Sequence, residues 1–239
     1  MIDQALSDLE IYQGDGVDSI LLENDHDLPY IQPPLDERGV ALMTQIARET
    51  RQRFSGPIGI QMLEAANVTS LEIASEADLD YIRVEAYVFA HMGGSGIIDG
   101  SAGKILRRRK ELGAEHIQVF ADVKKKHGSH SLTIDLDIAE EIRQAEFFLV
   151  DGVIVTSQFT GSSPDKDDLR KAKSATELPV LIGSGMTAEN IREYMTLADG
   201  FIVGSYFRKD GKFLETLEPH RLQTFMKAFA EAKENTQAE

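Results

Sequence analysis

PVLIGSGMTAENI (Pro179–Ile191) and ADGFIVGSYFRKDG (Ala198–Gly211) are the two stretches of sequence that decide the predicted fold. Each begins with a short apolar run and ends in a turn of small residues, Gly183-Ser184-Gly185 in the first stretch and Gly204-Ser205 in the second. Turns of this kind after the last two strands are typical of (β/α)8 barrels, which build phosphate sites there. A doubly wound dinucleotide-binding sheet would instead carry G-x-G-x-x-G after an early strand, and none appears there.

Upstream of these stretches, short apolar runs rich in Val and Ile alternate with longer amphipathic stretches, as in parallel sheets with helical crossovers. The predicted strands are residues 17–23, 57–63, 81–87, 116–123, 151–157, 179–185 and 200–207. The predicted helices are residues 2–12, 36–54, 101–112, 134–148, 165–176 and 187–197, with a last one from Pro219. Since no linker interrupts the series, we expect one barrel domain over residues 1–239, with a polar tail that frays from about residue 231.

Only seven strands can be counted, whereas a (β/α)8 barrel has eight and typically takes about 250 residues. This chain has 239 residues and opens directly in the predicted helix 2–12. The strand that should precede this helix is missing, which leaves the edges of strands 17–23 and 200–207 exposed. We expect the gap between these two strands to be bridged either by packing within the chain or by another chain, which would give a homo-oligomer through the open edge. The alternative is that the natural N-terminus is longer.

Composition excludes several function classes. With 25 basic and 40 acidic residues the formal charge is −15, which argues against a nucleic-acid partner. Because Cys is absent, disulfides and thiolate metal sites are excluded. No apolar run approaches the roughly 18 residues of a membrane span, and the acidic start is unlike a signal peptide. The sequence predicts a cytoplasmic protein without cofactor or integral membrane association, with peripheral membrane association or organelle import of a longer form left open.

The two glycine turns are the predicted phosphate-binding site. Glycine lets the backbone approach an anion, and N–H groups at the turns point towards it. Arg208 and Lys209 follow the second turn and can add positive charge. The alternative is a pair of tight turns without a ligand. The phosphate-binding candidates are Gly183, Ser184, Gly185, Gly204 and Ser205.

Polar residues at the ends of two middle strands are the predicted catalytic groups. In YIRVEAY (Tyr81–Tyr87) the polar residues alternate with apolar ones, so Arg83 and Glu85 should face the barrel interior. By the same alternation Asp122 faces inward, with Lys124 just above it. A buried Arg83 needs a carboxylate partner, and Glu23, Glu85 and Asp122 are the candidates. These groups form either a structural ion-pair network or an acid/base pair with separated pKa values.

Further candidates lie in loops at the same rim. KKKHGSH (Lys124–His130) is a local positive patch that is either a solvated loop or a site that attracts an anionic ligand through Lys124 or His127. Glu23–Asp27 is an acidic cluster that either binds a divalent metal or caps a loop; we favour capping and predict no metal. Glu23 stays a catalytic candidate, and Asn24 and Thr156 join Arg83 and His127 as predicted ligand contacts.

The sequence resembles the BtpA/SgcQ family of phosphate-binding-type barrels over nearly its whole length. The matching segments include GVDSILLEND (Gly16–Asp25), IRVEAYVFAHMGGSGIIDGSAGKILRRRKELGA (Ile82–Ala114), FADVKKKH (Phe120–His127), DGVIVTSQFTG (Asp151–Gly161) and the two stretches quoted first. The resemblance implies a (β/α)8 barrel. It implies less about chemistry, since the namesake is similar to a photosystem I biogenesis or stability factor.

Two departures from the family pattern fall on the expected functional face. Members resemble IGMIHLPPLPG at their start, a segment with no counterpart here, and Gln61, Glu64 and Glu85 replace residue types that relatives carry at strand ends. We expect a barrel that binds a small phosphorylated metabolite, a sugar phosphate or nucleotide derivative, as a lyase or isomerase. The alternative is a non-catalytic assembly or stability factor for a protein complex.

Overall fold

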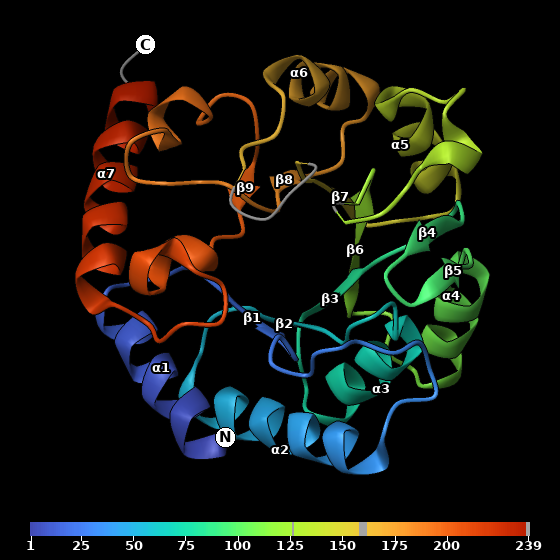
Figure 1. The fold of residues 1–239 in the computed structure, drawn as a ribbon, viewed down its shortest axis with the longest axis horizontal. Coiled ribbons are helices and arrows are strands. Elements are labelled where there is room, and N and C mark those ends of the chain that lie inside the picture. Colours follow the sequence, from blue (N-terminus) through green and yellow to red (C-terminus); the bar gives the residue numbers. More distant parts are fainter. Residues whose placement is uncertain (126, 158–161, 238–239) are drawn as a thin grey trace.

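Seven parallel strands form a curled sheet, a barrel open on one side, in the computed structural model of residues 1–125, 127–157 and 162–237 (Figure 1). In these residues the strand order is β1-β2-β3-β6-β7-β8-β9, and each neighbouring pair is parallel. The prediction of an α/β barrel with seven strands in the chain is therefore confirmed. The strands are β1 (Ile20–Glu23), β2 (Ile58–Gln61), β3 (Tyr81–Val84), β6 (Gln118–Val123), β7 (Gly152–Val155), β8 (Val180–Ile182) and β9 (Gly200–Phe201).

Two strands of the sheet are buried on both faces. All four residues of β2 and all four of β7 are buried, as expected for a parallel sheet covered by helices. Registers such as Ile20↔Ile58 and Ile82↔Val119 align the carboxyl ends of the strands. Polar residues that follow the strands are thereby brought to one rim.

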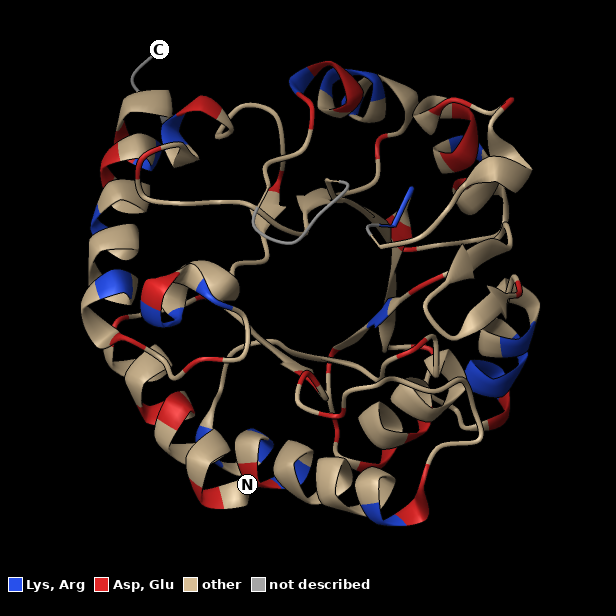
Figure 2. Cartoon of the chain, in the orientation of Figure 1, with Lys and Arg blue, Asp and Glu red and all other residues tan. Residues whose placement is uncertain are grey.

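Helices cover the outside of the sheet, and acidic and basic residues are interspersed along them (Figure 2). Acidic side chains cap the N-termini of two helices. Asp36 accepts a hydrogen bond from the N–H of Gly39, and Asp137 and Glu140 form a capping box. No helix in the described ranges is long and apolar enough to cross a membrane. The helices are α1 (Ile2–Gly14), α2 (Glu37–Arg53), α3 (Asn67–Glu76), α4 (Ala102–Glu111), α5 (Ile138–Phe147), α6 (Lys166–Ala175) and α7 (Pro219–Gln237).

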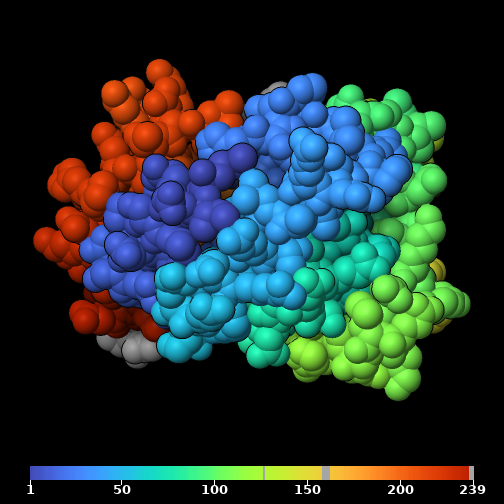
Figure 3. All heavy atoms as spheres, turned by 90° about the horizontal axis from the view of Figure 1, so that it is seen from below, coloured from blue at the N-terminus to red at the C-terminus, as the bar shows by residue number. Residues whose placement is uncertain are grey.

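The open side lies between β9 and β1, and α1 and α7 stand next to it (Figure 1). Seen from below, the first helix lies against the C-terminal part of the chain (Figure 3). The rings of Tyr12 and Phe207 are in edge contact across this junction, with centroids 6.1 Å apart. Side chains of α1 and of the segment after β9 therefore pack together at the open side of the barrel, although β1 and β9 do not pair with each other.

Two local predictions differ from the structure. The helix predicted over residues 187–197 is reduced to the single 3-10 turn Ile191–Glu193. The last predicted strand is short, since β9 ends at Phe201 and a 3-10 turn, η3 (Ser205–Phe207), follows. The last helix, α7, continues to Gln237, and fraying of the tail from about residue 231 stays a prediction.

A two-stranded antiparallel hairpin, β4 (His91–Gly93) and β5 (Gly96–Ile98), stands apart from the main sheet. It occupies the glycine-rich segment after β3. Gln32 donates to the carbonyls of Ser95 and Ile97, and Met92 forms a bridge with Ser129. The hairpin is thus held between the β1–α2 and β6–α5 loops, at the carboxyl ends of the strands.

Candidate functional site

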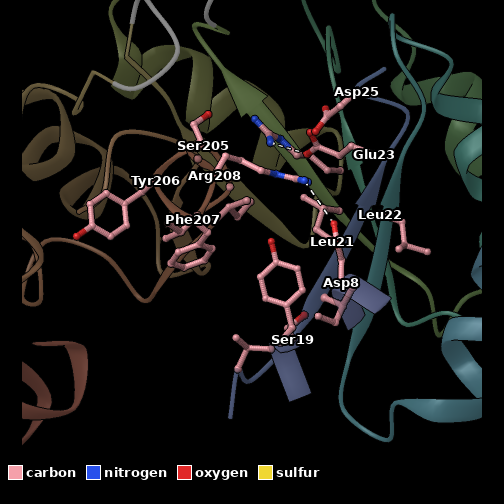
Figure 4. A pocket seen from close by; sticks show the side chains of 18 of the residues that line it. Asp8, Ser19, Leu21, Leu22, Glu23, Asp25, Ser205, Tyr206, Phe207 and Arg208 are labelled. Carbon is pink, nitrogen blue, oxygen red and sulfur yellow. Dashed lines mark hydrogen bonds and ion pairs between the residues drawn. The ribbon is translucent and has the colours of Figure 1, made fainter. Parts of the chain in front are cut away.

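A large cavity of about 1720 Å³ opens along the incomplete side of the barrel (Figure 4). It exceeds the roughly 300–1,000 Å³ of ordinary ligand pockets, because the barrel interior is accessible where no strand separates β9 from β1. Eight of the predicted site residues line it: Glu23, Asn24, Arg83, Gly183, Ser184, Gly185, Gly204 and Ser205. Glu85, Asp122, Lys124, His127 and Thr156 do not.

The three glycines of the predicted phosphate site differ in how much space their surroundings leave for a side chain. Gly185 has a φ of +80°, and a Cβ there would lie 2.1 Å from the carbonyl oxygen of Ser162. A Cβ on Gly183 would lie 2.7 Å from Ile154 Cγ2 and 3.2 Å from Arg83 Nη2. Packing alone thus requires these two glycines. Within the described part of the chain, a Cβ on Gly204 would meet no atom within 4 Å, so contacts among these residues do not explain this glycine.

Arg83 is the centre of a buried ion-pair network that joins three strands. Its Nε and Nη2 donate to the two carboxylate oxygens of Asp122 at 3.1 Å, and its Nη1 donates to Glu23 Oε1 at 3.0 Å. Burial disfavours the charged guanidinium, but Asp122 and Glu23 outweigh burial and raise its pKa. The prediction that a buried Arg83 has carboxylate partners is confirmed, with Asp122 and Glu23 as the partners.

A second buried cluster contains Lys125, a residue that the sequence argument missed. Its Nζ lies 2.9 Å from Glu85 Oε2 and 3.2 Å from Glu64 Oε1. Gln61 donates to the other Glu85 oxygen at 3.0 Å. Burial lowers the pKa of Lys125, but Glu85 and Glu64 raise it more, so the net shift is upward. Lys125 is therefore a charged ammonium, which disfavours a role as a nucleophilic amine.

Lys124 is not brought to this cluster. Its φ of 49° ends the strand alternation, and its Nζ lies 3.0 Å from Glu141 Oε1 on α5 and donates to the carbonyls of Thr133 and Leu136. The inward position that alternation predicts for Lys124 is taken instead by Lys125. Lys126 lies outside the described residues.

The β4–β5 hairpin covers the second cluster. Ser95 at its tip donates to Glu64 Oε2 from its N–H at 3.0 Å and from its hydroxyl at 2.6 Å. Burial raises the pKa of Glu64, but the bonds from Ser95 and the charge of Lys125 lower it more. Burial, with Lys125 and His130 nearby, lowers the pKa of His91 to about 4. His91 is therefore a neutral imidazole at neutral pH.

Non-glycine residues with left-handed backbone gather at the ends of the strands around these clusters. Ala65 follows β2, Ala86 follows β3, and Lys124 and His127 follow β6, with φ values of 54°, 45°, 49° and 62°. Such conformations cost about 1–3 kcal/mol each and concentrate at functional sites. Their clustering at this rim favours a functional role for it.

The remaining predicted contacts are placed as follows. Asn24 is buried and ties β1 to the end of β2, since it accepts from the N–H of Leu63 at 2.7 Å and donates to its carbonyl. Thr156 is buried, and its Cγ2 would lie 2.8 Å from a Cβ on Gly183. His127 is exposed. Among the described residues, no three His, Asp or Glu side chains form a group that could hold a metal ion.

Glu85 is expected to give the stability of the protein a measurable pH dependence. Burial raises its pKa from 4.5 to about 6, although Lys125 opposes the shift. Because the folded pKa is above the unfolded one, the contribution of Glu85 to the free energy of unfolding is complete below pH 4.5 and falls by about 2 kcal/mol as the pH rises through 6. Glu85→Gln should remove this slope in urea unfolding. Glu76→Gln, at an exposed ion pair with Arg48, should keep it; equal slopes in both variants would contradict the assignment.

The fold and the site define a (β/α)-barrel protein with a cavity along its open side that reaches the carboxyl ends of its strands. The chain belongs to the BtpA family, whose model matches residues 1–231. It is 41% identical over 223 residues to an uncharacterised mitochondrial protein of Caenorhabditis elegans, covering 91% of this chain and 80% of that protein. It is 33% identical over 232 residues to the photosystem I biogenesis protein BtpA of Synechocystis, covering 97% and 80%.

Two solved structures from Pyrococcus furiosus show the same fold at low sequence identity. One is N-(5'-phosphoribosyl)anthranilate isomerase, with a TM-score of 0.62 and 16% identity over 95% of both chains. The other is thiamine phosphate pyrophosphorylase, with a TM-score of 0.60 and 14% identity, covering 97% of this chain and 90% of that one. At these identities the similarity establishes the barrel fold alone.

Proposed function

We propose that this protein binds a small phosphorylated metabolite, a sugar phosphate or nucleotide derivative, at the carboxyl ends of its strands. The observation that carries the proposal is Gly204, a cavity-lining glycine that no contact with the described residues requires. Ser205, Ser184 and Gly185 line the same cavity. The two barrel enzymes of similar fold are named for phosphorylated compounds, which supports this ligand class.

The proposed reaction is that of a lyase or isomerase, with proton transfer at the end of the ligand opposite the phosphate. Glu23 lines the cavity and is held by Arg83, so we assign proton transfer to Glu23. Glu85 and Asp122 do not line the cavity and act as positioning residues, Asp122 through Arg83 and Glu85 through Lys125. Lys125 replaces Lys124 in this scheme. Asn24 stays a predicted ligand contact, whereas Thr156 and His127 do not line the cavity and have no role in this scheme.

Gly204→Leu tests the phosphate site directly. A Cβ there would meet no atom of the described residues within 4 Å, and Gly204 lines the cavity, so we expect a leucine side chain to occupy the space assigned to the phosphate. We expect binding of inorganic phosphate and ribose 5-phosphate, followed by 31P NMR and calorimetry, to weaken at least tenfold, about 1.4 kcal/mol. The matched control is Gly14→Leu, since Gly14 also has open space but does not line the cavity.

Two outcomes would contradict this proposal. One is a wild-type protein that binds neither compound at millimolar concentration. The other is a folded Gly204→Leu variant that binds them as the wild type and Gly14→Leu do.

A non-catalytic role in assembling a protein complex is the second candidate. Three neighbouring rim segments carry exposed large apolar side chains, and Gln32 joins two of them through Ser95 and Ile97. Patches of this kind mark protein interaction sites. The similarity to a photosystem I biogenesis protein supports this candidate, and failure of phosphate binding would favour it. The exposed residues are Leu28, Ile31, Met92, Ile97, Leu132 and Ile134.

Self-association through the open side and a cytoplasmic location remain proposals. The edges of β1 and β9 that face the gap lack a strand partner among the described residues, and such edges favour pairing with another chain. A molar mass in solution equal to one chain would contradict self-association. Fractionation of cells tests the location, for which the mitochondrial relative provides the competing expectation.

A further inference from the structure

Arg208 and Asp8 form an ion pair across the open side of the barrel. Arg208 follows the glycine turn of β9 by a few residues, and Asp8 lies on α1; both line the cavity. Figure 4 shows the Arg208 side chain reaching from the Ser205 side of the cavity to Asp8. The pair connects residues that are 200 positions apart in the sequence. An arginine beside the proposed phosphate site is thus occupied by a carboxylate from α1.

The geometry of this pair is that of a weak contact. Arg208 Nη1 lies 3.4 Å from Asp8 Oδ2 and 3.4 Å from the carbonyl oxygen of Glu215. Charge-assisted hydrogen bonds are usually about 2.7–2.9 Å long. Asp8 also accepts a hydrogen bond of 2.8 Å from Gln4 through its other oxygen. The guanidinium therefore keeps most of its capacity for a bidentate anion.

We propose that Arg208 is a phosphate-binding residue and that it pairs with Asp8 when no ligand is bound. A phosphomonoester dianion then displaces Asp8 and binds to the guanidinium. The inference rests on the proposed function. A phosphate carries about −1.5 to −2 charges at neutral pH and presents several oxygens to a guanidinium fork, so it competes well against one carboxylate at 3.4 Å. Asp8 thus lowers phosphate affinity by occupying the guanidinium of Arg208.

The same competition makes phosphate binding loosen α1. Because Asp8 and phosphate compete for the same guanidinium, their effects on each other are reciprocal. A change that weakens the ion pair between Arg208 and Asp8 strengthens phosphate binding, and bound phosphate weakens the ion pair. Tyr12 and Phe207 remain in contact across the junction, so α1 stays docked by apolar packing while it loses this polar contact. Amide hydrogens of residues 2–14 should exchange faster when inorganic phosphate is bound.

Asp8→Asn is the decisive variant. We expect it to bind inorganic phosphate three- to tenfold more tightly than the wild type, whereas Arg208→Gln should bind at least tenfold more weakly. In the Arg208→Gln background, Asp8→Asn should lose most of its effect, because the pair acts through one guanidinium. Asp3→Asn is the matched control, since it makes the same charge change on α1 at a residue that does not line the cavity.

The results separate this inference from the proposed function. If the wild type does not bind phosphate, the proposed function itself fails. If the wild type binds but Asp8→Asn binds no tighter than Asp3→Asn, only the role of Asp8 is wrong. Should Asp8→Asn not fold, hydrogen exchange of the wild type decides: unchanged exchange in residues 2–14 on phosphate binding overturns the inference.

Discussion

Arg83→Met is expected to destabilise the fold by about 3–5 kcal/mol, the usual cost of removing one partner of a buried ion pair. The guanidinium makes a bidentate contact with Asp122, whose side chain is 1% exposed, and a further bond to Glu23. Without it, the Asp122 carboxylate remains buried without its cation. Urea unfolding followed by circular dichroism measures the effect.

An exposed pair provides the control for this experiment. Arg48 and Glu76 are in contact at 2.7 Å, but both side chains are 54% exposed, so Arg48→Met should cost less than about 1 kcal/mol. If both variants lost the same free energy of unfolding, the buried ion pairs of Arg83 would not be the cause of the loss. Asp122→Asn combined with Arg83→Met should recover part of the loss, since it removes the stranded carboxylate.

Lys125→Met is expected to produce the second large loss, and one that depends on pH. It leaves Glu64 and Glu85 buried without a shared cation, at a cost of several kcal/mol near neutral pH. The pKa of Glu85, already raised to about 6 by burial, should rise further. Since a raised folded pKa gives stability that is lost as pH increases, the deficit should be larger near about pH 8 than near about pH 5.

The neighbouring lysine provides a matched control. Lys124 lies on the other side of the backbone, pairs with Glu141 and has a side chain that is 28% exposed. Lys124→Met should therefore destabilise much less and show no comparable pH dependence. A larger effect of Lys124→Met than of Lys125→Met would contradict the assignment of Lys125 to the buried cluster.

Sequence patterning was sufficient for the sheet because buried parallel strands are apolar on both faces. Runs such as Pro57–Leu63 and Asp151–Ser157 contain β2 and β7. Alternation also placed Arg83 and Asp122 on the interior face, where they pair. Alternation predicts the direction of a side chain only within an extended strand, and Arg83 and Asp122 both lie within such strands.

The predictions fail where the backbone leaves regular geometry. Alternation assigns Lys124 to the interior, but its left-handed φ of 49° turns the chain and exchanges the two lysines. Glu64 was noted as a departure from the family, yet its contact with Lys125 joins residues 61 positions apart, which no local pattern indicates. Four left-handed residues at one rim are visible only in three dimensions.

The helix expected over residues 187–197 fails for a related reason. The N–H of Thr187, the first residue of the predicted helix, donates to the side chain of Asn190 at 2.8 Å. Asn190 also donates to the carbonyl of Gly185, so the segment is tied to the glycine turn and forms only the turn Ile191–Glu193. Side-chain bonds of this kind compete with helical backbone bonds.

The contact between α1 and the segment after β9 has a consequence for the order in which the chain acquires its structure. Asp8 leaves the ribosome 200 residues before its partner Arg208. At about 5–20 residues per second, the partner follows roughly 10–40 s later. During that time Tyr12 lacks Phe207, the ring that it contacts in the folded protein. A chaperone that recognises exposed aromatic side chains therefore has a long opportunity to bind α1 before the last unit of the barrel is complete.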